Sequence, residues 1–130
     1  MKSIIYHLVP QDIWVALPPD QPYTPADYDR EGFIHCTAGE EQLAVVANRY
    51  YQHDPRVWLA LVIDRERVAA EIKYEPGGDG LLYPHIYGPL NREAVLVAAL
   101  MPRDPHGTFR PLRHSWLNRL EETLCFLKHI

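Results

Sequence analysis

The sequence predicts an α+β fold, and three observations lead to it. Residue patterns give the order strand, helix, strand, helix, followed by a run of strands. No helix alternates with the strands of the second half, which argues against a doubly wound parallel sheet. The length of 130 residues fits one domain with a single core. We expect this core to span residues 1–101, followed by a proline-rich connection and a C-terminal helix within residues 102–130.

In the first half, strands are predicted where β-branched and aromatic residues gather, and helices where apolar residues recur at helical spacing. Pro10 ends the first strand and suits the first turn of the helix that follows. Thr37, with Glu40 three residues later, predicts a capping box for the longer helix. The expected elements are a strand over 3–9, a helix over 10–17, a loop over 18–28, a short strand over 32–37 and a helix over about 38–52.

In the second half, an almost wholly apolar run predicts a central strand, and a glycine-rich segment predicts a loop. Asn91 is expected to cap a single helical turn. The expected elements are strands over 57–63, 70–75, 82–87 and 94–101, with a turn over 64–67 and a loop over 76–80. Apolar residues at helical spacing predict an amphipathic C-terminal helix over 115–129, which we consider a candidate surface for oligomer formation.

Composition excludes several classes of function. The net charge of −4 and the pI near 5.9 argue against a nucleic-acid-binding protein, which would carry a basic face. No apolar run is long enough to span a bilayer, and the N-terminus lacks the features of a signal peptide. Cys36 and Cys125 lie in different contexts and are expected to be free thiols. We therefore expect a cytoplasmic protein without a nucleic-acid or membrane partner.

Three histidines are the strongest candidates for chemistry. His7, His35 and His85 each lie in an apolar, strand-like segment beside aromatic residues. A neutral imidazole both donates and accepts a hydrogen bond, so it suits a ribose hydroxyl or a proton-transfer step. Taken singly, a histidine in a strand is more often structural, with its ring nitrogens bonded to nearby backbone. The three together favour a site, and we take them as candidate catalytic residues.

Other chemistries find less support in the sequence. His35 and Cys36 are adjacent, so in a strand they point to opposite faces and do not ligate one metal ion or form a Cys–His pair. A metal site formed by the three histidines on folding is the weaker alternative, and we expect no bound metal. Neither a Walker-type phosphate loop nor a dinucleotide fingerprint is present. Glu71 and Glu75 could serve as general bases, although solvated surface acids are the commoner case.

Four segments carry a resemblance to a known family: residues 5–8, 31–37, 46–51 and 84–90. The strings Gly-Phe-Ile-His-Cys from residue 32 and His-Ile-Tyr-Gly-Pro from residue 85 are its specific parts. The sequence resembles the domain of unknown function 952 family of small bacterial proteins, from the first strand to about residue 101. That family is similar to a divergent branch of the ADP-ribosyltransferase-like fold. The resemblance implies two small, roughly perpendicular, antiparallel-rich β-sheets with flanking helices around a cleft that binds NAD.

The resemblance also implies roles for individual residues. His7 fits the first-strand histidine that contacts ribose, and the second strand, with Phe33, His35 and Thr37, fits the nicotinamide side. From the residues alone, the aromatic rings of Tyr6, Phe33, Tyr83 and Tyr87 could offer flat faces to a ring ligand. The candidate ligand-binding residues are Tyr6, Phe33, Thr37 and Tyr87. At the late strand, where active members carry a glutamate, the sequence has His85 and Tyr87.

Three functions follow as hypotheses. The first is an enzyme that binds NAD or a related nucleotide and cleaves or transfers at its N-glycosidic bond. The second is a non-catalytic module that binds a small nucleotide-like metabolite, which the replaced glutamate favours. The third is a partner-binding domain that uses the C-terminal helix. NAD is the cofactor that the resemblance suggests, and the residues themselves leave the ligand open.

Overall fold

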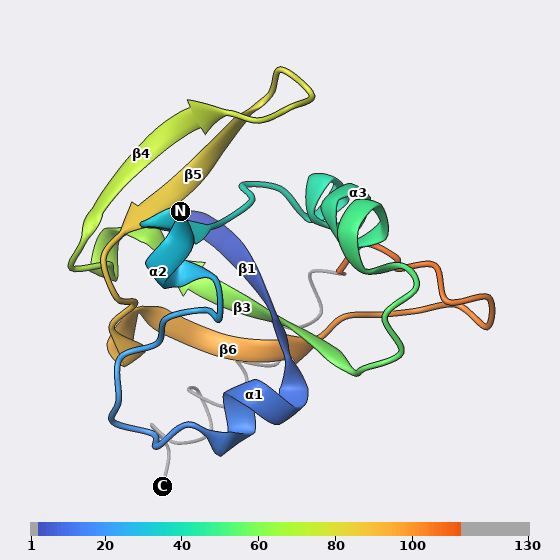
Figure 1. The fold of residues 1–130 in the computed structure, drawn as a ribbon, viewed down its shortest axis with the longest axis horizontal. Coiled ribbons are helices and arrows are strands. Elements are labelled where there is room, and N and C mark those ends of the chain that lie inside the picture. The colour runs from blue at the N-terminus through green and yellow to red at the C-terminus, as the bar shows by residue number, and fades with distance from the viewer. Residues whose placement is uncertain (1–2, 113–130) are drawn as a thin grey trace, which may run out of the picture.

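A computed structural model describes residues 3–112 of the 130-residue chain (Figure 1). The strands are β1 (Ile4–Pro10), β2 (Ile34–His35), β3 (Trp58–Asp64), β4 (Glu71–Pro76), β5 (Leu82–Tyr87) and β6 (Val95–Leu100). The helices are α1 (Gln11–Ala16), α2 (Tyr28–Glu31) and α3 (Glu40–Tyr51), with 3₁₀ turns η1 (Arg65–Arg67) and η2 (Arg92–Ala94). The predicted C-terminal helix over 115–129 and Cys125 lie outside the described residues.

The strands form two antiparallel sheets, which confirms the predicted α+β class with two small sheets. The first sheet has the order β1-β3-β6 and the second has the order β2-β5-β4. β3 is buried along its whole length, as its continuous apolar run predicts. The two sheets are joined by backbone hydrogen bonds of 2.8 Å in both directions between Tyr6 of β1 and Thr37, just after β2.

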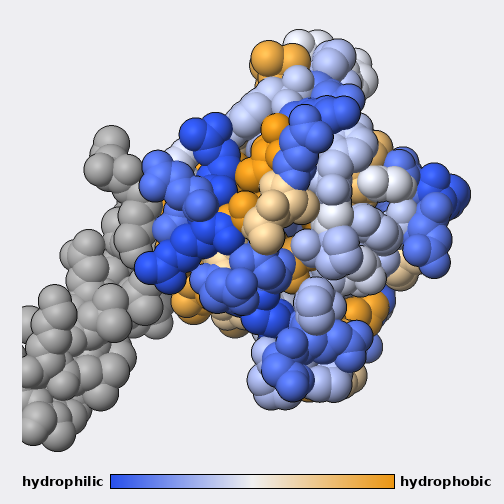
Figure 2. Space-filling model, turned by 90° about the vertical axis from the view of Figure 1, so that its left-hand side faces the viewer, coloured by the Kyte–Doolittle hydropathy of each residue, from blue (hydrophilic) through white to orange (hydrophobic). Residues whose placement is uncertain are grey.

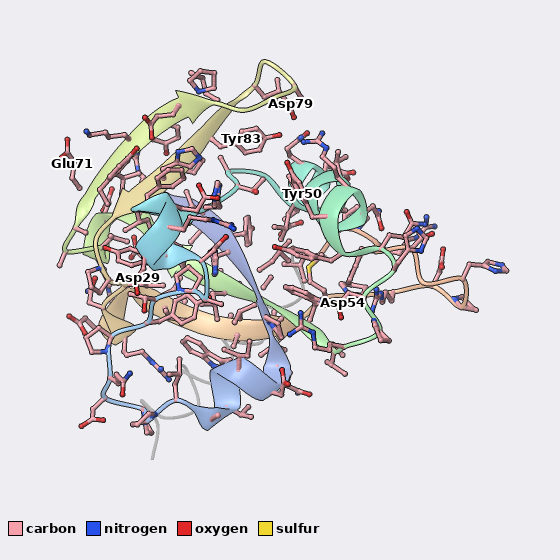
Figure 3. All side chains as sticks on the ribbon, in the orientation of Figure 1. Asp29, Tyr50, Asp54, Glu71, Asp79 and Tyr83 are labelled. Carbon is pink, nitrogen blue, oxygen red and sulfur yellow. The ribbon has the colours of Figure 1, made fainter. Side chains whose placement is uncertain are left out.

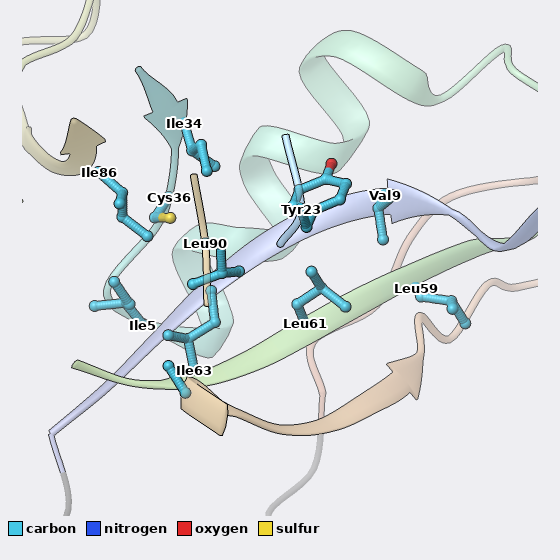
Figure 4. Packing of buried hydrophobic residues seen from close by; sticks show 11 residues of the cluster. Ile5, Val9, Tyr23, Ile34, Cys36, Leu59, Leu61, Ile63, Ile86 and Leu90 are labelled. Atoms are coloured by element: carbon cyan, nitrogen blue, oxygen red, sulfur yellow. The ribbon is translucent and has the colours of Figure 1, made fainter. Parts of the chain in front are cut away.

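The hydrophobic core has two parts, one on each face of the first sheet. The first cluster packs Ile5 of β1 and Leu61 of β3 against Ile34 and Ile86 of the second sheet (Figure 4). The second cluster packs the other face of the first sheet against α3 through Leu43 and Ala47. Because strand side chains alternate, residues 5, 7 and 9 of β1 all face the first cluster. His7 is thereby directed into the space between the sheets.

Two sequence predictions at the second strand are corrected. The strand is two residues long rather than spanning 32–37, because Gly32 takes the left-handed conformation (φ 82°) that ends α2. The predicted capping box of Thr37 and Glu40 does not form. Helix α3 begins at Glu40, its N-cap residue is Gly39, and no side chain makes a capping hydrogen bond. The backbone of Thr37 is instead paired with β1, three residues before the helix.

Other predicted boundaries agree closely with the structure, and one side-chain role differs. The predicted strand over 82–87 matches β5 at both ends. Asn91 precedes the predicted single turn, but its side chain does not cap it. Its amide bonds the Arg67 carbonyl and its oxygen accepts from the backbone N–H of Ala69, so Asn91 holds the segment before β4 in place.

The chain continues to pack beyond residue 101. Phe109 and Leu112 are buried in the second cluster. Asn48 of α3 bonds both the N–H and the carbonyl of Phe109, at 2.7 and 3.0 Å. The Arg103 guanidinium donates to the carbonyl of Tyr51, the last residue of α3, and to that of Asp54 just after the helix. The division at residue 101 stays a prediction, and within residues 3–112 no helix is long and apolar enough to cross a membrane.

Candidate functional site

A cleft of about 770 Å³ reaches residues of both sheets, α2 and α3. Ligand sites commonly have volumes of about 300–1,000 Å³ and few polar groups among apolar and aromatic side chains. The cleft is lined by all three predicted histidines, together with Tyr23, Phe33 and Tyr83. It is the place where the two sheets could hold a small molecule jointly.

The second sheet has one apolar face and one face that carries histidines. Ile34, Ile72 and Ile86 are in register across the three strands and turn toward the core. Alternation therefore places the cross-strand partners His35 and His85 on the opposite face. Two of the predicted catalytic residues come together in this way.

Phe33 is the centre of an aromatic group on this face. Its ring is stacked on His85 at a centroid distance of 4.1 Å and an interplanar angle of 19°. The rings of His35 and Tyr87 lie 4.7 and 5.3 Å from it. The two imidazoles are 5.1 Å apart and nearly perpendicular, at 75°. Four of the predicted site residues thus form one contact group, although Tyr87 is not among the residues that line the cleft.

His85 has a carboxylate partner. Its Nδ1 lies 2.9 Å from Oε1 of Glu75 on β4, and the Tyr87 hydroxyl donates to the same oxygen at 2.5 Å. The hydrogen bond from Tyr87, followed by that from His85, lowers the pKa of the Glu75 carboxyl below its ordinary value. Glu75 is therefore an ionised acceptor near neutral pH. The His85 side chain is 10% exposed, whereas that of Glu75 is 38% exposed.

His35 has a different environment from His85. Its side chain is 54% exposed, and Nε2 lies 3.9 Å from a carboxylate oxygen of Glu31 on α2. Burial of the ring, and next the neighbouring His85, lower the pKa of His35 from its ordinary value. His35 is thus expected to be neutral at pH 7 and open to a ligand.

His7 is bonded at both ring nitrogens inside the protein. Nδ1 lies 2.6 Å from the His35 carbonyl oxygen, and Nε2 lies 2.7 Å from the Tyr23 hydroxyl. A carbonyl only accepts, so Nδ1 carries the hydrogen and the Tyr23 hydroxyl donates to Nε2. Burial lowers the pKa of His7 to about 4. This neutral imidazole connects three segments: β1, β2 and the loop that precedes α2. Such a connection is typical of a structural histidine.

Tyr6 and Thr37 also line the cleft, but through the first sheet. The Tyr6 hydroxyl donates to Glu40 at 3.3 Å, and its ring belongs to the second cluster below α3. Thr37 is buried, and its backbone pairs with Tyr6. The seven predicted residues therefore divide into a contact group on the second sheet and a support formed by His7, Tyr6 and Thr37.

Sequence reasoning missed the partners of the histidines. Tyr23, 1% exposed, lies in a proline-rich stretch that predicts only a surface loop. Glu75 was considered with Glu71 as a possible general base or, more commonly, a surface acid, but not as a partner of a histidine. One signal was available for it: hairpin pairing of the predicted strands 70–75 and 82–87 puts Glu75 opposite Tyr83 and diagonal to His85.

One group in the described part of the chain has the composition of a metal site. Asp27, Glu31 and His35 offer ligand atoms that all lie within 4.8 Å of one another. Carboxylate and imidazole suit Zn²⁺ and related ions. Arg30, however, lies 3.8 Å from the Asp27 carboxylate and 3.5 Å from that of Glu31, and so already provides positive charge. The expectation that the protein binds no metal stays a prediction.

The far rim of the cleft joins the β4–β5 hairpin to α3. Tyr83 projects from β5 toward the helix, and Asp79 lies at the hairpin tip (Figure 3). Gln42 of α3 donates to the Tyr83 hydroxyl at 2.8 Å, and Arg49 pairs with Asp79 at 3.3 Å. The Tyr83 hydroxyl also donates to Asp79.

On the side of the molecule that carries β4, hydrophobic atoms reach the surface as small areas between hydrophilic ones (Figure 2).

Fold and site together define a small α+β domain with a histidine-lined cleft between two antiparallel sheets. The chain belongs to the family described as protein of unknown function (DUF952), whose model matches residues 8–98. This confirms the family resemblance drawn from the four sequence segments. No curated protein matches the chain.

Solved structures of one bacterial protein share the fold. The crystal structure of protein CC0527 from Caulobacter crescentus aligns with a TM-score of 0.71 at 24% identity, over 91% of this chain and 98% of that one. The solution NMR structure of CC0527 aligns with a TM-score of 0.67, over 88% and 96% of the two chains. The wider likeness to ADP-ribosyltransferases and the perpendicular placement of the sheets stay predictions.

Proposed function

We propose that this protein binds NAD or a related nucleotide in the cleft and cleaves or transfers at its N-glycosidic bond. The observation that carries the proposal is the pairing of His35 and His85 across β2 and β5, with Phe33 stacked on His85 and all three lining the cleft. A flat ring and two imidazoles supply a platform for a heterocycle and groups that exchange protons.

In this proposal the second sheet supplies the reacting groups. Phe33 offers its ring as an apolar surface beside the heterocycle of the ligand. His35, half-exposed and neutral, orients the ligand by hydrogen bonding. His85 accepts the proton of the attacking hydroxyl or water, while the glycosidic bond breaks and its electron pair leaves with the heterocycle.

The first sheet has a supporting role. His7 was expected to contact the ribose, but both of its nitrogens are bonded to protein atoms. It holds the His35 backbone and the Tyr23 hydroxyl at the cleft wall.

A non-catalytic binding module is the second candidate. The occupied nitrogens of His7 favour it, since a first-strand histidine with no free nitrogen contributes no direct contact to a reacting ribose. The cleft and its aromatic group would then serve recognition alone. The two candidates differ in turnover and agree in binding.

Calorimetry and product analysis test both candidates. NAD, ADP-ribose and AMP are titrated into the purified protein, and released nicotinamide is measured by chromatography. We expect binding that weakens at least tenfold in Phe33→Leu, and turnover that is lost in His85→Gln. His53→Gln is the matched control, since His53 is exposed and lies outside the cleft. Binding without turnover identifies a binding module, and absence of binding for all three ligands refutes the proposal.

A further inference from the structure

We propose that Glu75 is the positioning residue of the site: it fixes His85 as the Nδ1–H tautomer and so leaves Nε2 as the proton acceptor on the cleft side. The proposal deepens the proposed function, on which its chemical consequence rests. The tautomer itself is a property of the free protein. β4 carries one other acid, Glu71, and the register of β4 against β5 is what sets Glu75 beside His85.

The first step is the direction of the hydrogen bonds. An ionised carboxylate only accepts, so the 2.9 Å contact requires the hydrogen on Nδ1 of His85. The Tyr87 hydroxyl donates to the same Oε1. Two donors therefore converge on one oxygen, and each contact favours the ionised form of Glu75. With the opposite tautomer, the lone pair of Nδ1 would face a negative charge.

The second step is that the His85 ring has little freedom. The stacked Phe33 covers one face, and the side chain is 10% exposed. With Nδ1 held by Glu75, a flip of the ring would break the hydrogen bond. Nε2 makes no hydrogen bond to any residue from 3 to 112, which leaves it available to a ligand in the cleft that His85 lines.

The third step is the set of charges around the imidazole. Lys73 is the register partner of His85 on β4, but its ammonium lies over the Tyr87 ring, 4.7 Å from the centroid. His35 faces His85 from β2, with Glu31 of α2 beyond it. Glu75 is thus the carboxylate in direct contact with His85. His35, by contrast, has a carboxylate only at 3.9 Å.

In the proposed reaction, His85 transfers the proton and Glu75 orients the His85 ring. Nε2 of His85 takes the proton of the attacking water or hydroxyl as its oxygen bonds to the anomeric carbon. The C–N bond breaks, and its electron pair leaves with the heterocycle. The resulting imidazolium shares its Nδ1–H with Glu75 and later returns the Nε2 proton to solvent. A carboxylate that orients a catalytic histidine in this way is a recurrent arrangement in enzymes.

The test is the ¹⁵N spectrum of the histidine side chains at a pH where the rings are neutral. The signals of His85 are identified by their loss in His85→Gln. In the wild type we expect a protonated Nδ1 and an unprotonated Nε2. In Glu75→Ala, and in Glu75→Gln, whose amide can donate to Nδ1, we expect the Nε2–H form to appear. Glu71→Gln is the matched control, since Glu71 lies on the same face of β4 and makes no contact with His85.

The tautomer of His85 can be determined in the free protein, so this test needs no known ligand. A wild-type protein with the Nε2–H form of His85 overturns the proposal, and so does an unchanged tautomer in both folded Glu75 variants. Where NAD turnover is present, Glu75→Gln should lower kcat by about 10–100-fold with little change in KM, as for other groups that orient a functional imidazole. Absence of turnover refutes the enzyme proposal alone and leaves the tautomer result standing.

Discussion

At the scale of single residues, His7 shows how a polar side chain is accommodated between two sheets. Its ring is buried in the row of β1 that faces the first cluster. Both nitrogens are satisfied, one by a backbone carbonyl and one by a tyrosine hydroxyl. Burial without such partners would cost about 1–3 kcal/mol per group. The neutral form is the one that both contacts require.

Stability should therefore depend on pH through His7. Its pKa is about 4 in the folded protein, against 6.5 for the ordinary imidazole. Well above pH 6.5 the ring is neutral in both the folded and the unfolded state and adds nothing to the pH dependence of stability. As the pH falls from 6.5 to about 4, the unfolded chain binds the proton first, and the free energy of unfolding drops by up to roughly 3 kcal/mol.

Urea unfolding of the wild type and of His7→Gln measures this effect. The variant keeps a donor and an acceptor but does not titrate, so its curve of stability against pH should be flatter between pH 6.5 and 4. Contributions from carboxylates and from His35 are common to both proteins and cancel in the difference. Parallel curves would show that His7 is not held neutral by burial.

The residue scale also shows what sequence can predict about a site. Phe33, His35, His85 and Tyr87 were found from their aromatic, strand-like context, and strand alternation brings them to one face. Glu75 was weighed with Glu71 as a possible general base, with a solvated surface acid as the commoner case, and not as a partner of His85. Its importance depends on the register of β4 against β5, which is a pairing between residues ten positions apart and not a property of its own neighbourhood.

At the scale of elements, α3 connects the cleft to the second cluster. Leu43, Val46, Ala47 and Tyr50 recur at helical spacing in the sequence, which predicts that they share the buried face of this helix. The structure buries Leu43, Ala44 and Ala47, whereas Tyr50 is 66% exposed and lines the cleft. The helical period was predicted correctly, but the buried face is centred on the side of Ala44 and not on that of Tyr50. The reason is that the segment around Phe109 covers the helix near Asn48.

Leu43→Ala should lower the free energy of unfolding by about 2–5 kcal/mol, since Leu43 is fully buried and its loss leaves a cavity. Val45→Ala on the same helix, where the side chain is 48% exposed, is the control and should change stability by no more than about 0.5 kcal/mol. Denaturant unfolding at pH 7.5 measures both. Equal effects would mean that the helix does not pack through the Leu43 face.

At the scale of the whole molecule, the fold class and nearly every strand followed from residue patterns. The partition of six strands into two sheets did not, because β1 pairs with β3 and β3 with β6 over long separations. Local patterns indicate that a strand exists and which face is apolar, but leave its partner open. The backbone hydrogen bonds between Tyr6 and Thr37, which link the two sheets, could not be predicted from the sequence either.

The segment after β6 should be necessary for stability. A chain ended at residue 101 loses the buried side chains of Phe109 and Leu112 and the backbone partners of Asn48. We expect its free energy of unfolding to be lower by at least about 3 kcal/mol than that of a chain ended at residue 112. Denaturant midpoints of the two chains decide the matter, and equal midpoints would support a core that is complete at residue 101.

The contact between His7 and Tyr23 has a consequence for how this family changes over evolutionary time. The Tyr23 hydroxyl donates to His7 in a place that water does not reach, since the residue is 1% exposed. An apolar residue at position 7 would leave that buried hydroxyl without a hydrogen-bond partner. Phenylalanine at position 23 would leave the imidazole Nε2 of His7 without one. Either single step is disfavoured, and a joint replacement must also provide a donor for the His35 carbonyl, which His7 bonds. Homologues should therefore carry the two positions as a pair, changing together or not at all.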